Sequence, residues 1–276
     1  MRLIGHLSDL HFGRHDPCVV DGLLESLGEI RPDLLAISGD LTQRARRHEF
    51  AAARAFLDRL PAPYVVVPGN HDMPLYNVLK RLLRPLSRYG RFIAPDRYML
   101  YKDSEIAVLG ISTPRALTGA NGRISSRQLA DVEAVFKPMP NDHWKILVSH
   151  HPLLAPPQRA DLPAVRGAAR ALEAVAAAGV RLVLAGHYHQ PFSIDAGVQS
   201  VTAQDSILVV QAGTATSTRL RGEANSFNLI RVDRDAVVCQ PQLWDGRRFI
   251  PANAVRFRLA DGGRWHNGPE DACVVP

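Results

Sequence analysis

The stretch RLIGHLSDLH, residues 2–11, contains the pattern on which the fold depends. An apolar run, Arg2–Leu7, is followed at once by the polar residues Ser8, Asp9 and His11. A short apolar run bounded by polar residues predicts a buried strand. In open α/β sheets the carboxyl ends of the strands are the usual place for a ligand. The stretch therefore predicts a buried strand that delivers Asp9 and His11 to a binding edge.

Apolar strands and amphipathic helices alternate through the residues that follow. Val19–Ile30 has apolar residues at helical spacing, and Glu49–Leu60 is an Ala-rich segment ended by Pro61, so both predict helices. Leu34–Ser38 and Tyr64–Val67 are short apolar runs that predict buried strands. Strands joined by helices through short turns indicate a parallel sheet with right-handed crossovers. The first part of the chain therefore predicts an α/β fold.

The rest of the chain adds two further groups of elements. The first group comprises a hairpin of Arg97–Lys102 with Ile106–Ser112, helices at Ser125–Phe136 and Val165–Ala178, and strands at Lys145–Ser149 and Arg181–Ala185. The second group comprises antiparallel strands at Phe192–Ala196, Ile207–Ala212, Phe227–Val232, Ala236–Leu243 and Ala254–Leu259. We expect one domain over residues 1–260, a cap insertion at residues 73–101, and an irregular tail at residues 261–276.

Composition excludes several classes of protein. The 276 residues are 46% hydrophobic and 22% charged, which excludes a wholly disordered chain. Apolar runs are too short for a membrane-spanning helix, and polar residues follow Leu3 and Ile4 too soon for a signal peptide. The 3 cysteines are far apart, which favours a reducing, cytoplasmic location. The net charge of +6 favours anionic partners, although a basic solvated surface is an equally good interpretation.

Polar side chains capable of binding metal follow five of the predicted strands. They are Asp9 and His11, then Asp40, then Asn70, His71 and Asp72, then His150 and His151, and finally His187 and His189. Residues two apart in extended chain point the same way, which pairs Asp9 with His11 and His187 with His189. Carboxylates, imidazoles and an amide oxygen suit a borderline divalent metal. Even seven ligands from this set are too many for one ion and suit two ions that share a carboxylate.

In this order, D-x-H, G-D, G-N-H-D, H and G-H-x-H resemble the motifs of the calcineurin-like metallophosphoesterase superfamily, in particular its bacterial cyclic-nucleotide phosphodiesterase-like branch. The resemblance covers residues 2–189 and implies a four-layer α/β/β/α sandwich of two mixed sheets flanked by helices, with a dinuclear metal site at the strand edge. It also implies two metal-ligand sets. The first is Asp9, His11, Asp40 and His189, and the second is Asp40, Asn70, His150 and His187. His71 would then face the substrate, with Asp72 as its orienting partner.

The resemblance implies hydrolysis of a phosphodiester in a small anionic substrate, of the cyclic-nucleotide or glycerophosphodiester class, by a hydroxide that bridges the metals. The metals would be Mn²⁺, Fe²⁺/Fe³⁺ or Zn²⁺, among which the sequence does not choose. The alternative is a hydrolase of a lipid-linked nucleotide pyrophosphate, whose basic cap would hold the lipid precursor. A nuclease and a non-catalytic metal-binding scaffold are weaker alternatives, and no stable nucleic-acid complex is expected.

Several residues are weaker candidates for substrate contact. His151 would lie behind the metals or face the substrate, because His150 directly follows the strand and is preferred as the ligand. Asn121 lies in a Gly-rich loop, and residues 214–221 form a second loop that would reach the substrate. Arg81 and Arg84 belong to a basic segment at residues 79–97. This segment would contact a phosphate, a nucleotide or a lipid head group, including peripheral contact with a membrane, or would form an amphipathic helix with solvated arginines.

Overall fold

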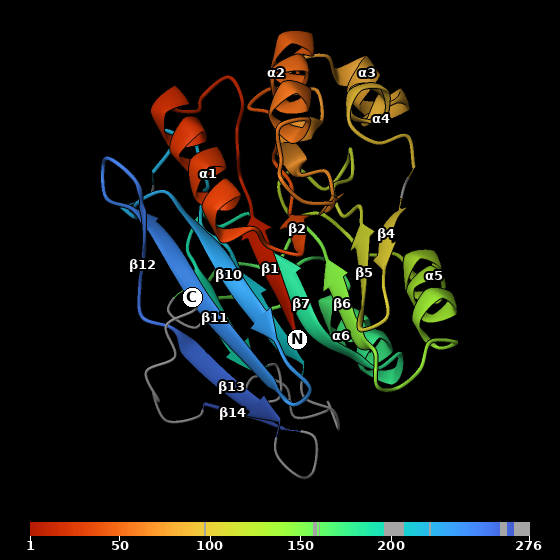
Figure 1. Cartoon of the computed structure of the whole chain (residues 1–276). Helices are drawn as coiled ribbons and strands as arrows, with labels where there is room; N and C mark the ends of the chain where they lie inside the picture. Colours follow the sequence, from red (N-terminus) through yellow and green to blue (C-terminus); the bar gives the residue numbers. More distant parts are fainter. Residues whose placement is uncertain are drawn as a thin grey trace.

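The computed structural model describes residues 1–96, 98–156, 159, 161–195, 207–220, 222–259 and 264–267. Two sheets face one another in the middle of the molecule, and helices cover their outer faces (Figure 1). This arrangement confirms the predicted α/β/β/α sandwich of two mixed sheets. In the described part of the chain, no helix has both the length and the apolar character needed to cross a membrane.

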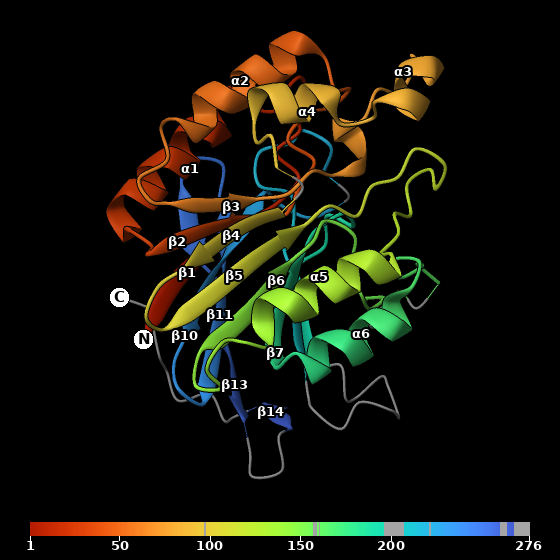
Figure 2. The same cartoon turned by 90° about the vertical axis from the view of Figure 1, so that its right-hand side faces the viewer.

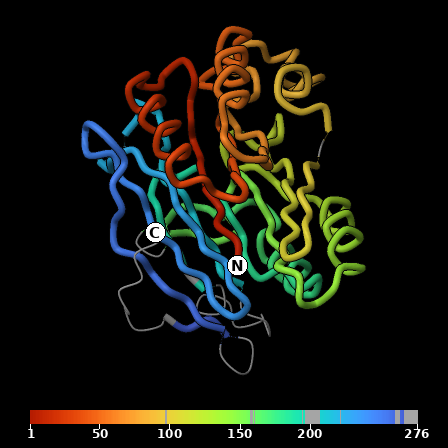
Figure 3. The backbone as a smooth tube through the Cα atoms, in the orientation of Figure 1, coloured from red at the N-terminus to blue at the C-terminus, as the bar shows by residue number. Residues whose placement is uncertain are grey.

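The first sheet has strand order β14-β13-β11-β10-β1-β2-β3, and β12 also pairs with β11. Its strands are β1 (Arg2–Leu7), β2 (Leu34–Ile37), β3 (Tyr64–Val66), β10 (Ser226–Val232), β11 (Ala236–Trp244), β12 (Phe249–Pro251), β13 (Val255–Leu259) and β14 (Trp265–Asn267). The strands β1, β2 and β3 are parallel, whereas β10 lies antiparallel to β1. Figure 3 shows β1, in red, in the middle of this sheet between a blue and an orange strand.

The second sheet has strand order β4-β5-β6-β7-β9-β8. Its strands are β4 (Tyr98–Lys102), β5 (Ile106–Ile111), β6 (Trp144–Val148), β7 (Val180–Ala185), β8 (Phe192–Asp195) and β9 (Leu208–Gln211). The four central strands are parallel, and the two edge strands are antiparallel to their neighbours. The parallel strands of both sheets therefore provide the carboxyl ends at which the predicted ligands lie.

The helices form the two outer layers and a cap. They are α1 (Pro17–Ile30), α2 (Arg47–Leu57), α3 (Val78–Leu83), α4 (Ser87–Phe92), α5 (Ser126–Phe136) and α6 (Ala168–Ala177). Figure 2 shows α1 and α2 on one side of the sheets and α5 and α6 on the other, with α4 beside α2 and α3 beyond α4. Local chemistry fixes two helix starts, because Asp16 accepts a hydrogen bond from the N–H of Cys18, and Ser125 and Gln128 cap α5 reciprocally.

Alternation along the strands divides the core into three layers. In β2, Leu34 and Ala36 face the other sheet, whereas Leu35 and Ile37 face α1 and α2. In the second sheet, Leu147 packs with the cluster that includes α5 and α6. A side-chain period of two gives one strand two apolar faces when both are buried. The continuous apolar runs of the sequence therefore reflect strands that are covered on both sides.

Three features differ from the sequence-based expectations. The strand expected at Ile207–Ala212 is antiparallel to β8 but parallel to β7, because β8 reverses the chain at the sheet edge. The expected tail contributes the short strand β14, whose Trp265 packs on Trp144. The expected cap divides into the helices α3 and α4 and the sheet strand β4. Ala196 and Arg221, the last residue of the loop at 214–221, lie outside the described residues, as do most of the tail and Arg97.

Candidate metal centre

The seven side chains predicted as metal ligands lie together at one edge of the sandwich. Asp9 and His11 follow β1, Asp40 follows β2, and Asn70 follows β3 in a short 3-10 helix. The second sheet contributes the remaining three, His150 after β6 and His187 and His189 after β7. The cluster therefore takes its side chains from both sheets.

The backbone turns sharply where it leaves these strands. Five of the seven residues have positive φ, namely Asp9 at 53°, His11 at 51°, Asp40 at 52°, His187 at 82° and His189 at 61°. A residue with a Cβ in this region carries a cost of about 1–3 kcal/mol, which is usual where function dictates the geometry. The strand ends are therefore shaped for the side chains they present.

The first subset of the cluster is Asp9, His11 and His189. Their ligand atoms all lie within 4.8 Å of one another. His189 Nε2 is 3.1 Å and His11 Nε2 is 3.5 Å from Asp9 Oδ1. The other oxygen, Asp9 Oδ2, accepts hydrogen bonds from the Ser8 hydroxyl at 2.6 Å and the His187 N–H at 3.0 Å. Asp9 is thus held by one oxygen while the other points into the cluster.

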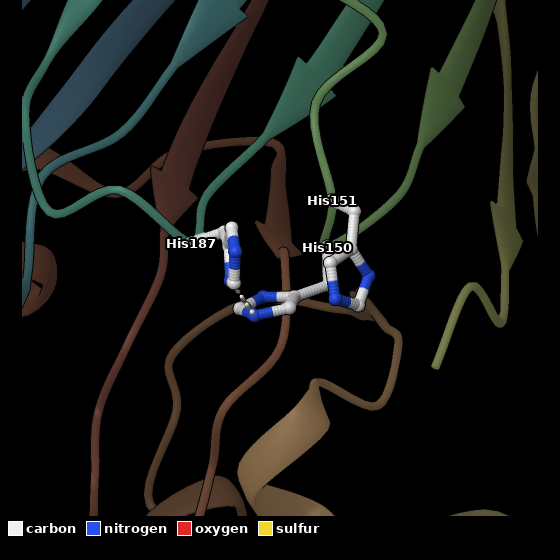
Figure 4. Close-up of side chains that lie close together, drawn as sticks. All are labelled: His150, His151 and His187. Atoms are coloured by element: carbon white, nitrogen blue, oxygen red, sulfur yellow. Dashed lines mark hydrogen bonds between the residues drawn. The ribbon is translucent and has the colours of Figure 1, made fainter. Parts of the chain in front are cut away.

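The second subset is built around His150. Its Nε2 lies 3.3 Å from Asp40 Oδ2, 3.2 Å from Asn70 Oδ1 and 3.3 Å from His187 Nδ1. Figure 4 shows the His150 and His187 rings meeting, with His151 beside them. His150 Nδ1 donates to the Ser38 carbonyl at 2.7 Å, which leaves Nε2 as the ring atom that faces the cluster.

Asp40 belongs to both subsets. Its Oδ2 is 3.8 Å from His11 Nε2 in the first subset and 3.3 Å from His150 Nε2 in the second. Its Oδ1 accepts from the His71 N–H at 2.8 Å, which orients the carboxylate. Asp9, Asp40 and His150 also offer ligand atoms within 4.8 Å of one another. The two subsets are therefore adjacent and share one carboxylate.

The cluster concentrates buried negative charge. Burial alone would raise the pKa of Asp9, but the nearby His189 holds it well below its usual range. Burial also opposes ionisation of Asp40, and His150 and His71 outweigh it, so the pKa of Asp40 is lowered. In return, Asp40 outweighs the burial of His150 and raises the pKa of that ring to about 9. Both carboxylates are therefore ionised at neutral pH.

These observations fit a pair of divalent cations. Asp9 and Asp40 are both buried. Among the described residues, histidines are the only side chains able to carry a positive charge that lie within 4 Å of their carboxylate oxygens. Asp9 Oδ1 accepts no hydrogen bond from those residues. Buried carboxylates require a compensating charge. Burial and the neighbouring His150 lower the pKa of His187 to about 3, which leaves a neutral imidazole suited to metal binding.

Glycines permit the close approach of the strand ends. A Cβ on Gly69 would lie 2.1 Å from Asp40 Oδ1, and one on Gly186 would lie 1.8 Å from Ser8 Oγ. Both distances are far shorter than a non-bonded contact allows. The glycines at these positions thus allow the ends of β2 and β3, and the ends of β1 and β7, to approach each other closely.

His71 lies at the margin of the cluster. Its ring centroid is 4.8 Å from that of His11. Its Nδ1 donates to the Gln43 carbonyl at 2.9 Å, and its Nε2 is 3.4 Å from a guanidinium nitrogen of Arg219. The Arg219 carbonyl is also 3.3 Å from His189 Nδ1. The loop that carries Arg219 therefore reaches the cluster, whereas Gln43 gave no signal in the sequence.

The predicted role of Asp72 as the orienting partner of His71 was wrong, because the contacts of its carboxylate are elsewhere. Asp72 is fully buried and accepts hydrogen bonds from the N–H groups of Leu41, Thr42 and Gly69. Burial, together with the charge of Asp40, raises the pKa of Asp72 to about 6. Asp72 therefore fixes the loop that carries Asp40, and Gln43 holds the ring of His71.

His151 does not face a substrate, contrary to that part of the prediction. Its Nε2 donates to the Ala120 carbonyl at 2.7 Å, and its Nδ1 pairs with the Thr113 hydroxyl at 2.7 Å. Both ring nitrogens are therefore occupied, and the ring is buried. The preference for His150 over His151 as the residue facing the cluster agrees with this geometry. Asn121 lies in the loop that His151 holds and stays a predicted substrate contact.

The two arginines predicted to bind substrate have different surroundings. The Arg81 guanidinium donates to the carbonyls of Pro74, Ala116 and Gly119, so it anchors α3 to a neighbouring loop. Arg84 lines a cavity of about 690 Å³ between α4 and the start of α5. None of the seven clustered ligands lines this cavity, among the residues that the structure describes. Both arginines therefore lie apart from the cluster, and neither contacts it.

The fold and the cluster together define a class of protein. Residues 2–191 match the calcineurin-like phosphoesterase family, and the chain belongs to that family. Solved structures share its fold. A dimetal phosphatase from Danio rerio has a TM-score of 0.64 at 14% identity and covers 91% of this chain and 98% of its own. A purple acid phosphatase from yellow lupin has a TM-score of 0.68 at 11% identity, with 92% and 53% coverage.

Two phosphodiesterases are similar to this chain in sequence. The chain is 30% identical over 193 residues to the 3',5'-cyclic adenosine monophosphate phosphodiesterase CpdA of Escherichia coli (strain K12), covering 66% of each. It is 27% identical over 164 residues to the glycerophosphodiester phosphodiesterase GpdQ of Enterobacter lignolyticus, covering 55% of this chain and 57% of the relative. The chain thus spans about two thirds or less of the length of these relatives.

Proposed function

We propose that this chain is a metal-dependent phosphodiesterase that acts on a small anionic diester of the cyclic-nucleotide or glycerophosphodiester class. The observation that carries the proposal is the sharing of Asp40 between two sets of ligand atoms, with His11 on one side and His150 on the other. The names of the CpdA and GpdQ relatives support the same substrate classes.

We assign one cation to Asp9, His11, Asp40 and His189, and the second to Asp40, Asn70, His150 and His187. Manganese, iron and zinc all suit this donor set. When bound, two such cations would activate a water molecule and stabilise the charge of the phosphoryl group. Hydrolysis forms a bond from phosphorus to the water oxygen and breaks the bond to one ester oxygen, which must gain a proton.

His71 and Arg219 are the groups of the chain that would act on the substrate itself. Nδ1 of His71 donates to the Gln43 carbonyl, which leaves Nε2 as the ring atom facing the substrate. With the ring in its protonated, imidazolium form, Nε2–H would donate a proton to the departing oxygen or a hydrogen bond to a phosphoryl oxygen. The Arg219 guanidinium beside it would bind a phosphate oxygen. Asp72 keeps the loop that carries Asp40 in place.

The direct test is hydrolysis by chelated and metal-reloaded protein. The panel comprises a cyclic nucleotide, glycerophosphoethanolamine, an aryl phosphomonoester and a nucleotide pyrophosphate, each with manganese, iron or zinc. We expect diesters to be preferred, activity to vanish on chelation, and Asp40→Ala to lose metal and turnover together. Asp21→Ala removes an exposed carboxylate outside the cluster and should change neither. Undiminished hydrolysis after chelation, or hydrolysis confined to monoesters, would refute the proposal.

One observation favours a second candidate. The cap helix α3 exposes several leucines beside basic residues, which suits a hydrolase of a lipid-linked nucleotide pyrophosphate. Cleavage of the pyrophosphate in preference to both diesters would select that alternative.

A further inference from the structure

The cap carries an unusual concentration of exposed apolar side chains. They are Leu75, Tyr76, Val78, Leu79, Leu82 and Leu83, and each is between 49% and 72% exposed. None of the residues of α3 is buried. We call residues 75–84 the cap surface. Isolated exposed leucines are ordinary on a soluble protein, but so many in one short segment indicate a surface that binds something apolar.

A neighbouring loop enlarges this apolar surface. Leu117 is 85% exposed, and its loop is tied to α3 because Arg81 donates to the carbonyls of Ala116 and Gly119. Figure 2 shows α3 projecting beyond α4, at the end of the molecule opposite β13 and β14. A flat partner can therefore reach the cap surface without meeting the body of the protein.

Positive charge surrounds the leucines. Lys80 and Arg84 belong to the cap surface, and Arg47 begins α2 beside it. Slight burial and the like charges of Arg88 and Arg47 lower the pKa of Lys80, so these cations lie near one another. Among the described residues, none of the ion pairs involves Lys80, Arg84 or Arg47. The cap surface is therefore both apolar and basic, and although Asp96 lines the same cavity as Arg84, it forms no ion pair with it.

The combination of charge and apolar area selects the partner. A second copy of the chain in a symmetric dimer would place these cations against their own equivalents, which is unfavourable. A nucleic acid would neutralise the cations but would leave the leucines in water. An anionic bilayer satisfies both, because apolar side chains enter the boundary of head groups and acyl chains while Lys and Arg bind lipid phosphates.

We propose that the cap surface docks this chain on an anionic lipid bilayer, with Leu79, Leu82 and Leu83 inserted and with Lys80, Arg84 and Arg47 on the lipid head groups. The docking is peripheral, since it uses one short helix and a loop. It does not depend on hydrolytic activity, and it applies whether the substrate is soluble or lipid-linked.

The test is flotation of the full chain with vesicles of phosphatidylcholine alone or mixed equally with phosphatidylglycerol, at low and high salt. We expect binding to the anionic vesicles only, and weaker binding at high salt. The double variant Leu79→Asp/Leu83→Asp should bind at least about tenfold less, because it loses two inserting side chains and gains two negative charges. Lys80→Glu/Arg47→Glu should reduce binding at low salt to a similar extent.

Control measurements separate docking from damage to the fold. Ile250→Asp introduces a single negative charge on β12, away from the cap surface, and should bind vesicles as the parent does. Thermal unfolding of every variant should match the parent within a few degrees, since the altered side chains are exposed. Equal flotation of the Leu79→Asp/Leu83→Asp variant would overturn the proposal. So would a concentration-dependent dimer that this variant abolishes, because the cap surface would then bind a second copy.

Discussion

Replacement of Gly186 by alanine tests the contact between the two sheets at the cluster. Gly186 directly follows β7, and a Cβ there would lie 1.8 Å from Ser8 Oγ and 2.8 Å from Asp9 Oδ2. The Ser8 hydroxyl must then move and lose its 2.6 Å hydrogen bond to Asp9. The alanine therefore displaces the carboxylate that the cluster requires.

The magnitude follows from two costs. Overpacking of a buried site costs about 1–3 kcal/mol, and loss of a hydrogen bond to a charged acceptor costs about 1.5–3 kcal/mol. A total of about 2.5–6 kcal/mol lowers the melting temperature of a chain this size by about 5–20 °C. Displacement of a group that orients a ligand weakens metal binding by about 10–100-fold.

The assay combines thermal unfolding with metal analysis after dialysis against a limiting metal concentration. Gly28→Ala is the matched control, because Gly28 lies inside α1 and a Cβ there meets no atom within 4 Å. It should gain about 0.5–1 kcal/mol of stability from helix propensity. An unchanged melting temperature and full metal loading in Gly186→Ala would refute the close approach of β7 to Ser8.

Substitutions at three further positions test the site and the strand beneath it. His71→Ala should lower kcat by about 100-fold or more with metal content unchanged, and full turnover would remove His71 from the reaction. Arg219→Ala should lower kcat/KM by about 10–100-fold, with partial recovery in Arg219→Lys, whereas equal loss in both would indicate a structural role. Burial lowers the pKa of His6 to about 3 in the folded state. Below pH 6.5 the unfolded state therefore binds a proton that the folded state does not, and the free energy of unfolding decreases as the pH is lowered. The free energy of unfolding of metal-free protein can be measured by urea titration at pH 7 and pH 5. Over this range it should fall by about 2 kcal/mol less in His6→Gln than in the parent. An identical fall in both proteins would contradict a neutral His6.

Much of the cluster could be predicted because its signal is local. Each ligand lies within four residues of the end of a strand, and a strand buried on both faces is visible as an apolar run. The run Leu34–Ile37 and the Gly39-Asp40 that follows it show this, since all four strand residues are buried and Asp40 leaves the strand at positive φ. Topology then brings parallel carboxyl ends to one edge. The identities of the ligand-type residues therefore follow from short segments.

What could not be predicted depends on contacts between distant segments. Gln43 and Arg219 are 28 and 148 residues from His71, and nothing near His71 indicates either partner. The same limit explains Asp72, whose sequence neighbour is His71 but whose carboxylate binds Leu41, Thr42 and Gly69. The apolar pattern of a strand likewise indicates which of its faces are buried but not which strand pairs with it. The parallel pairing of β9 with β7 was therefore not predicted.

The origin of the ligands in both sheets has a thermodynamic consequence. In the proposed assignment, each cation would bind residues that follow β1, β2 or β3 and residues that follow β6 or β7. Asp40 and His150, which approach to 3.3 Å, are one such pair. A bound ion would then act as a crosslink between the halves of the sandwich. Ligands that bind only the folded state stabilise it by an amount that grows with the logarithm of their concentration. The free energy of unfolding would therefore rise with the metal concentration. Loss of the metal would shorten the lifetime of the folded protein as well as remove its activity.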